Sequence, residues 1–167
     1  NIIPDINLKV SGLLYEQQSQ IIYSLGKILY ELKKAKKLVV PYIYGDTTTA
    51  VAAGIASFAN LISTAHVEAG LRTMNPPKRL IEELLGTFSP YQYFQELKQS
   101  KKWYKGSYEP YPEQFDTRAS GPSAGVHFAP TRLNADNLIN EGYAPETIFI
   151  VGNPVIVTRL RPFLNTF

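Results

Sequence analysis

Residues 63–73 read STAHVEAGLRT, and this stretch takes an apolar run into a carboxylate, a glycine and an arginine. The run LISTAHVE over 61–68 is short and largely apolar, which is typical of a buried strand. Ligand sites of parallel sheets lie beyond the carboxyl ends of the strands, so Glu68 stands where such a fold places its chemistry. A structural ion pair with Arg72 is the alternative interpretation, and the sequence leaves both open.

Further strands and helices are expected on both sides of this stretch. Leucine and isoleucine recur at steps of three, four and seven after Ser11, which predicts a long amphipathic helix. Over 46–60, aspartate and threonines precede small residues suited to a helix packed closely on a sheet. The other expected elements are strands over 37–45, 126–130 and 147–152 and helical segments over 77–86, 91–104, 111–118 and 131–142.

The order of these elements predicts the fold class. Strands that alternate with helices indicate an α/β fold, a parallel sheet with helices on both faces. Asp46, Glu68 and Asn153 each follow a predicted strand, so we expect them at one edge of the sheet. Pro41 lies inside the first strand and donates no ladder hydrogen bond, so we expect an unpaired edge or a bulge there.

Composition excludes several functions. The 167 residues suffice for one domain with its own core, and the absence of cysteine with only 2 histidines argues against disulfides, thiol chemistry and a zinc site. The net charge is only +3, and the basic run KKAKK at 33–37 falls at a helix end, where the dipole favours cations. No apolar run reaches the roughly 20 residues of a membrane span, and no signal peptide opens the chain. We therefore expect a soluble cytoplasmic protein that binds no metal, nucleic acid or membrane.

Three carboxylates are candidates for catalysis. Asp46 and Glu68 follow predicted strands, and Glu113 opens the helix expected at 111–118. Structural alternatives exist, because Asp46 is a good N-cap type and a helix N-terminus stabilises a carboxylate such as Glu113. If these side chains converge and burial raises one pKa, they could exchange protons with a carbon or oxygen atom of a substrate.

Two smaller features are weaker signals. His66 on an apolar strand favours the interpretation of a core histidine. The GNP turn at 152–154 could offer backbone N–H groups to a phosphate.

The same residues carry a family resemblance. The stretch YGDTTTAVAAGIASFANLISTAHVEAGLRT, residues 44–73, resembles the region of the non-hydrolysing UDP-N-acetylglucosamine 2-epimerases that runs from a Gly-Asp-Thr turn to a His-Val-Glu-Ala-Gly-Leu-Arg motif. Residues 111–118 resemble the family's Pro-Glu-Glu segment, and 16–22 resemble its Glu-Gln-Thr helix. Residues 128–156, FAPTRLNADNLINEGYAPETIFIVGNPVI, resemble its stretch from Phe-Ala-Pro-Thr to Gly-Asn-x-Val.

The resemblance implies a fold and a reaction. It implies Rossmann-like domains of the glycosyltransferase-B type, with a UDP-sugar in the cleft between two of them. It also implies interconversion of UDP-GlcNAc and UDP-ManNAc, by elimination of UDP to a glycal and re-addition on the other face. No cofactor is implied, and the product would serve cell-envelope polysaccharide. The implied residues are Asp46, Glu68 and Glu113 for proton transfer and Gln17, Arg72 and Asn153 for substrate binding.

The chain also departs from the family pattern. The family's first strands and its whole second domain would lie outside residues 1–167, so we expect a single, incomplete Rossmann-like domain. An irregular helical insertion is expected at about 74–111. Gln114 stands where the family has a second acid, and Asp116-Thr117 stand where it has an Asn-Arg pair.

An incomplete domain has physical consequences. Water would reach the carboxylates of half a cleft, which weakens the tuning of their pKa values. A truncated sheet also leaves an edge that association usually covers, so we expect a homo-oligomer or a complementing chain. The alternative function is that of a catalytically incomplete epimerase fragment that binds sugar nucleotides or serves as an interaction module.

Overall fold

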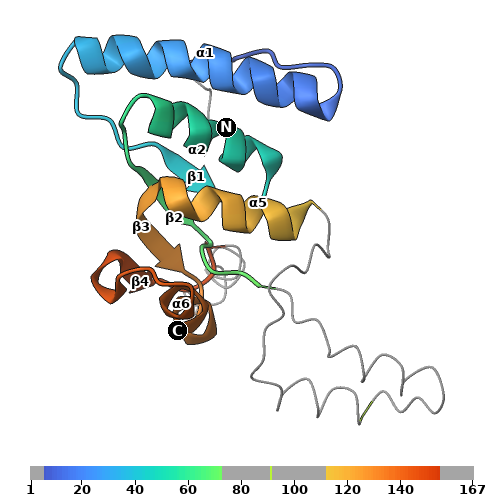
Figure 1. Ribbon diagram of the computed structural model, residues 1–167, viewed down its shortest axis with the longest axis vertical. Helices are drawn as coiled ribbons and strands as arrows, with labels where there is room; N and C mark the ends of the chain where they lie inside the picture. Colours follow the sequence, from blue (N-terminus) through green and yellow to red (C-terminus); the bar gives the residue numbers. More distant parts are fainter. Residues whose placement is uncertain (1–5, 73–90, 92–111, 155–167) are drawn as a thin grey trace, which may run out of the picture.

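The computed structural model describes residues 6–72, 91 and 112–154 (Figure 1). The expected alternation of helices and strands is confirmed there, whereas the helical segments expected between 77 and 104 and the insertion at about 74–111 lie outside the described residues, apart from Tyr91. The elements are α1 (Leu14–Lys34), β1 (Tyr42–Tyr44), α2 (Thr48–Ala59), β2 (Thr64–Val67), α5 (Glu113–Ser120), η1 (Gly121–Ser123), β3 (Ala124–Ala129), α6 (Arg132–Asn140), η2 (Pro145–Thr147) and β4 (Ile148–Ile150).

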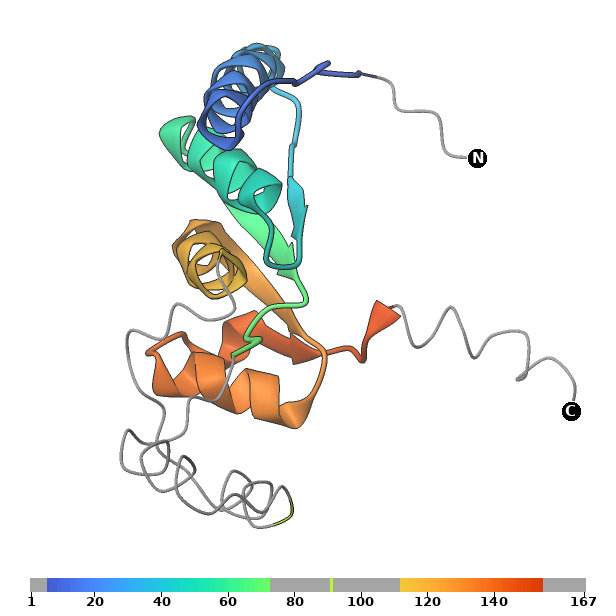
Figure 2. The same cartoon turned by 90° about the vertical axis from the view of Figure 1, so that its right-hand side faces the viewer.

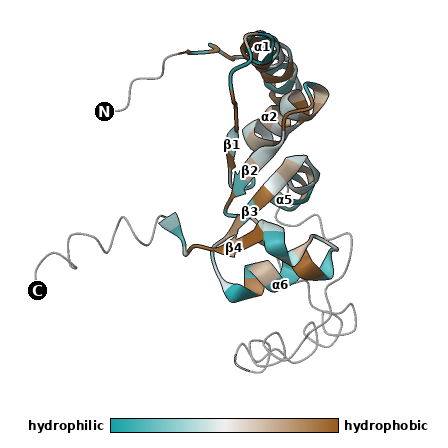
Figure 3. Ribbon diagram, turned by 90° about the vertical axis from the view of Figure 1, so that its left-hand side faces the viewer, coloured by the Kyte–Doolittle hydropathy of each residue, from teal (hydrophilic) through white to brown (hydrophobic). Residues whose placement is uncertain are grey.

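The four strands form one parallel sheet in the order β1-β2-β3-β4. A chain that adds each strand on the same side by right-handed crossovers keeps its connecting helices on one face. Figures 2 and 3 show this arrangement, with α1, α2, α5 and α6 all on one side of the sheet. The parallel α/β sheet is thus confirmed, and the described helices cover one of its two faces.

The two faces of the sheet differ in burial. Ile43, His66 and His127 lie side by side in the register, point toward the helices and are buried. On the other face, the rings of Tyr42 and Phe128 stack with their centroids 6.3 Å apart, and Tyr42 is 70% exposed. The side chains that face the helices therefore make the core, and an aromatic surface remains on the opposite face of the described sheet.

Pro41 lies immediately before β1 rather than inside it. Its carbonyl accepts a hydrogen bond from the Ala65 N–H at 2.9 Å, so the proline takes part in pairing only as an acceptor. This placement removes the conflict between proline and the ladder, because β1 begins at Tyr42.

Helix α2 packs closely because its residues are small. Its buried positions are Ala50, Val51, Ala52, Gly54, Ala56 and Ser57. A Cβ atom on Gly54 would lie 2.6 Å from Ser123 Oγ, so this position accepts no larger side chain without a shift in η1. The helix is capped by Thr47, whose hydroxyl accepts from the Ala50 N–H at 3.2 Å. The sequence offered Asp46 and the threonines that follow it as caps, and Thr47 takes that role in the structure.

Candidate functional site

The loop after β1 places Asp46. Gly45 has a φ of 71°, a left-handed conformation that favours glycine, and its N–H donates to the Val67 carbonyl at 2.9 Å. The Gly45 carbonyl accepts a 2.8 Å hydrogen bond from His66 Nε2. Because Thr47 caps α2, the half-buried carboxylate of Asp46 is not used as a helix cap. A tight turn held from two sides thus presents a carboxylate at the end of β1.

The exit of β2 places Glu68 beside the same turn. Glu68 has a φ of 61°, a left-handed conformation that is uncommon for a residue with a side chain. The Tyr44 hydroxyl donates to Glu68 Oε1 at 3.0 Å, and a Cβ atom on Gly45 would lie 3.7 Å from Glu68 Oε2. Burial and this hydrogen bond raise the pKa of Tyr44, so its hydroxyl remains a donor. Glu68 therefore lies next to the loop that carries Asp46.

Arg72 binds a partner far along the chain. Its Nε donates to Glu141 Oε1 at 2.7 Å and its Nη2 to Glu141 Oε2 at 2.5 Å, a bidentate pair. A further hydrogen bond of 3.3 Å reaches Thr117 Oγ1, and the Arg72 side chain is only 2% exposed. The suggested ion pair between Glu68 and Arg72 is not present. The contacts of Arg72 favour a structural role over the substrate contact expected from the resemblance.

Gly70 explains the glycine of the motif. It has a φ of 81°, and a Cβ atom there would lie 2.2 Å from the backbone oxygen of Asn134 in α6. The Gly70 carbonyl accepts from the side-chain amides of Asn134 and Asn137 at 3.2 and 2.9 Å. Gly70 and Arg72 thus dock the exit of β2 onto α6, and this docking fixes the backbone that follows Glu68.

The first turn of α5 carries two acids. Glu113 is half-buried, and its Oε2 atom is buried without a hydrogen-bond partner in the described part of the chain. Asp116 is 1% exposed, and its Oδ2 atom accepts from Thr48 Oγ1 of α2 at 3.0 Å. Burial raises the pKa of Asp116, the charges of Asp46 and Glu113 raise it further, and the hydrogen bond from Thr48 opposes the shift.

These interactions bring the acids of separate loops together. Asp46 and Glu113 each act electrostatically on Asp116, so the three form one acidic cluster (Asp46, Glu113 and Asp116) at the N-termini of α2 and α5. Glu68 lies beside Gly45, the residue that precedes Asp46 of this cluster. The convergence of Asp46, Glu68 and Glu113 on one substrate stays a prediction, and Asp116 was not among the site residues predicted from the sequence. The signal was its position three residues after Glu113 in a helix, where the two side chains are neighbours.

The two histidines are core residues. Burial lowers the pKa of His66, and the Nε2 hydrogen bond to the Gly45 carbonyl partly opposes this. Burial lowers the pKa of His127 to about 4, and its ring lies 4.5 Å from that of Tyr143, edge to face. Both rings are therefore neutral near pH 7. His66 fits the core interpretation, and it also supports the loop that carries Asp46.

Gln17 and Asn153 are the other two expected substrate ligands. Gln17 is in the first turn of α1, and its amide donates to the Gly12 carbonyl at 2.8 Å. Asn153 is half-buried and follows β4. The hydrogen bond of Gln17 to Gly12 stabilises the start of α1, and the assignment of Gln17 and Asn153 to substrate binding stays a prediction.

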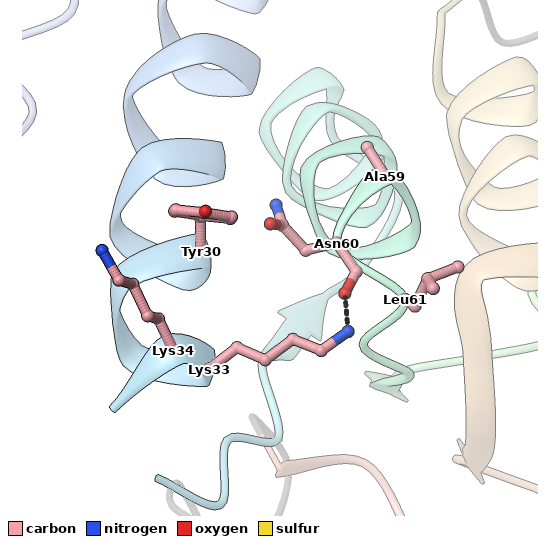
Figure 4. Close-up of a pocket in the computed structure, with 6 residues that line it drawn as sticks. All are labelled: Tyr30, Lys33, Lys34, Ala59, Asn60 and Leu61. Atoms are coloured by element: carbon pink, nitrogen blue, oxygen red, sulfur yellow. Dashed lines mark hydrogen bonds between the residues drawn. The ribbon is translucent and has the colours of Figure 1, made fainter. Parts of the chain in front are cut away.

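No metal centre and no membrane span are found in the described ranges. In residues 6–72, 91 and 112–154, no three His, Cys, Asp or Glu side chains are placed so that they could hold a metal ion, and no helix is long and apolar enough to cross a bilayer. A cavity of about 410 Å³ lies at the other end of α2, between the C-termini of α1 and α2 (Figure 4). Figure 4 shows Lys33 reaching the Asn60 carbonyl there, at 2.7 Å, with Tyr30 and Leu61 on the rim.

Comparison with known proteins identifies the family. The sequence profile described as UDP-N-acetylglucosamine 2-epimerase matches residues 2–86, just over half of the chain. The chain belongs to the UDP-N-acetylglucosamine 2-epimerase family. The UDP-N-acetylglucosamine 2-epimerases of Campylobacter jejuni and Bacillus subtilis are 34% and 32% identical to it, and each match covers 93% of this chain. The match covers 32% and 33% of those proteins, so the chain spans about a third of their length.

Solved structures of the epimerase family share the fold. UDP-GlcNAc 2-epimerase from Neisseria meningitidis, bound to UDP-GlcNAc, matches with a TM-score of 0.67 and 28% identity, over 96% of this chain and 36% of that one. The enzyme from Methanocaldococcus jannaschii, in complex with UDP-GlcNAc and UDP, matches with a TM-score of 0.68 and 25% identity, over 99% and 36%. The chain is thus a Rossmann-type α/β domain of the glycosyltransferase-B-like kind.

Proposed function

We propose that this chain supplies proton-transferring carboxylates to a UDP-N-acetylglucosamine 2-epimerase, which interconverts UDP-GlcNAc and UDP-ManNAc. The observation that carries the proposal is the meeting of acids from separate strand–helix junctions at one edge of the sheet. Membership of the family supports it, as do the sugar nucleotides bound to the two similar structures. The substrate is therefore proposed to be a UDP-sugar.

The reaction requires balanced proton movements. A base removes the proton at C2 of the sugar, the C1–O bond breaks, and UDP leaves with the bonding electrons to give a glycal. UDP then adds back to C1 while a proton reaches C2 from the other face. These steps need at least one base and one acid near C2, and Asp46, Glu68 and Glu113 are the proposed set. Carboxylates in partly buried surroundings can hold different protonation states, and no cofactor enters these steps.

Two features of these carboxylates suit them to the reaction. The hydrogen bond from the Tyr44 hydroxyl to Glu68 Oε1 fixes the orientation of the Glu68 carboxylate. The buried Oε2 atom of Glu113, without a partner in the described residues, suits an atom that bonds to a substrate. The removal of the C2 proton is assigned to the set of Asp46, Glu68 and Glu113 and not to one of its members.

The test measures deuterium exchange and binding on the full chain. The purified protein is incubated with UDP-GlcNAc in deuterated water, and incorporation at C2 is followed by NMR. Calorimetry on the same sample measures the affinity for UDP-GlcNAc. Exchange supports the epimerase function. Affinity without exchange supports the alternative of a sugar-nucleotide-binding module, and the absence of both contradicts the two functions for this chain.

We also propose that the chain works in the cytoplasm, in an assembly of identical copies or with a complementing polypeptide. In the described sheet β1 pairs only with β2, and Tyr42 lies exposed beside its outer edge. A second apolar surface lies between α2 and η1, where Ile55 and Phe58 line a cavity of about 210 Å³. Light scattering coupled to gel filtration tests the assembly, and a monomer at all concentrations contradicts it.

A further inference from the structure

Asp116 joins two of the loops that carry the proposed catalytic acids. Thr48 is the first residue of α2 and follows Asp46 by two positions, and Asp116 lies one turn after Glu113 in α5. The 3.0 Å hydrogen bond from Thr48 Oγ1 to Asp116 Oδ2 therefore ties together the first turns of the two helices. Within the described residues, no other side-chain hydrogen bond joins α2 to α5.

The surroundings of Asp116 disfavour a charge. It is 1% exposed, and the two nearest acids, Asp46 and Glu113, are both negative when ionised. The partner of Asp116 on α2 is the uncharged hydroxyl of Thr48. His66 of the sheet is neutral near pH 7 and so supplies no positive charge. The Arg72 guanidinium, whose loop contacts α5 through Thr117, is engaged by Glu141. A buried carboxyl group with acidic neighbours is stabilised as the neutral acid.

We propose that Asp116 is a positioning residue that clamps α2 to α5 through Thr48, so that Asp46 and Glu113 reach the same substrate. The inference rests on the proposed function, because it gives the clamp its purpose. The carboxyl group of Asp116 offers Thr48 an acceptor oxygen whether or not it carries a proton.

The first experiment measures the pH dependence of stability and needs no sugar. Asp116→Asn keeps the acceptor for Thr48 and removes the titration. The pKa of Asp116 is raised in the folded state. Its contribution to the free energy of unfolding is therefore fully present below the pKa of the unfolded chain, near 3.8, and is lost as the pH rises through the folded-state pKa. The Tm of the variant should therefore be close to that of the wild type at pH 4 and should exceed it at pH 8. An equal difference at both pH values, or a lower Tm of the variant at pH 8, contradicts the raised pKa of Asp116.

The second experiment measures Asp116 itself. Carbon-13 NMR follows the carboxyl carbon of Asp116 against pH in the wild type and in Thr48→Val. The wild-type midpoint should lie above the ordinary value of 3.8, and removal of the Thr48 hydrogen bond, which lowers the pKa of Asp116, should raise the midpoint further in the variant. A midpoint that does not change in Thr48→Val shows that the hydroxyl does not hold Asp116, which overturns the clamp.

The third experiment tests positioning through C2 exchange. Thr48→Val and Asp116→Ala break the clamp and should lower kcat for exchange by about tenfold or more with little change in KM, whereas Asp116→Asn should retain it. Thermal melts confirm that each variant is folded at the assay temperature. Equal exchange in all variants overturns the clamp. If the wild type shows no exchange, the proposed function fails while the melts and the NMR titrations still decide the state of Asp116.

Discussion

The two ends of α2 present opposite chemistry. Its N-terminal end meets the acidic cluster, where Asp116 is buried and Thr48 binds it. Its C-terminal end meets the cavity in Figure 4, where Lys33 is exposed beside the Asn60 carbonyl. The helix has 12 residues and so keeps the ends about 18 Å apart. The cavity of about 410 Å³ therefore lies at the end of α2 opposite to the acid with a raised pKa, so buried acidic groups and cavity volume point to different ends of this helix.

The largest expected effect comes from the acidic end. Glu68→Gln keeps the shape of the side chain and an acceptor for Tyr44 but removes the base. Exchange at C2 of UDP-GlcNAc should fall by about 10²–10⁴-fold, the usual contribution of a general acid or base. The matched control is Glu146→Gln, the same change at an exposed carboxylate in η2, and it should leave exchange unchanged. Undiminished exchange in Glu68→Gln would remove this residue from the mechanism.

The next largest effect is expected from His127, which is buried on the face of the sheet that the helices cover. Its folded-state pKa of about 4 is below the unfolded value of 6.5, so the unfolded chain binds more protons between these values. Its contribution to the free energy of unfolding is present above pH 6.5 and falls by at most about 3 kcal/mol as pH drops to 4. Urea unfolding at pH 7 and pH 5 measures it.

A substitution separates this effect from other titrations. His127→Phe removes the ionisable ring and keeps an aromatic neighbour for Tyr143. The difference in stability between pH 7 and pH 5 should be smaller in the variant than in the wild type. Asp116 has the opposite sign, since its acid form is favoured in the fold, so the two contributions partly cancel in the wild type. An unchanged pH dependence in His127→Phe contradicts the assignment.

A third comparison tests the docking of the β2 exit. Arg72→Met removes the bidentate ion pair with Glu141, in which the Arg72 side chain is 2% exposed. Arg132→Met removes the ion pair with Asp136 within α6, in which both side chains are exposed. Loss of a buried partner costs about 3–5 kcal/mol, and the partial exposure of Glu141 lowers the expectation to about 2–3 kcal/mol. The exposed pair should contribute about 0.5 kcal/mol or less. Urea unfolding distinguishes them, and equal losses contradict a structural role for Arg72.

The sequence predicts those features that depend on local order. Strand ends follow from apolar runs, and parallel strands bring their carboxyl ends to one edge, so the positions of Asp46 and Glu68 could be predicted. The partners of Arg72 and Asp116 could not, because Glu141 and Thr48 lie 69 and 68 positions away along the chain. No local pattern encodes such a pair. Likewise the choice of Thr47 over Asp46 as the cap depends on where the Gly45 turn ends.

The smallest expected effect lies at the basic end of α2. Lys33 donates to the Asn60 carbonyl, one of the unpaired acceptors at a helix C-terminus, where a cation contributes about 0.3–1 kcal/mol. Lys33→Met should lower stability by that amount in low salt and by less at high ionic strength, since exposed charges are screened. Lys34→Met is the matched control, because Figure 4 shows Lys34 pointing away from Asn60. Neither change should alter exchange with UDP-GlcNAc, because both lie a helix length from Glu68. A loss of exchange in Lys33→Met would mean that the two ends of α2 act together and that the contrast between them is not functional.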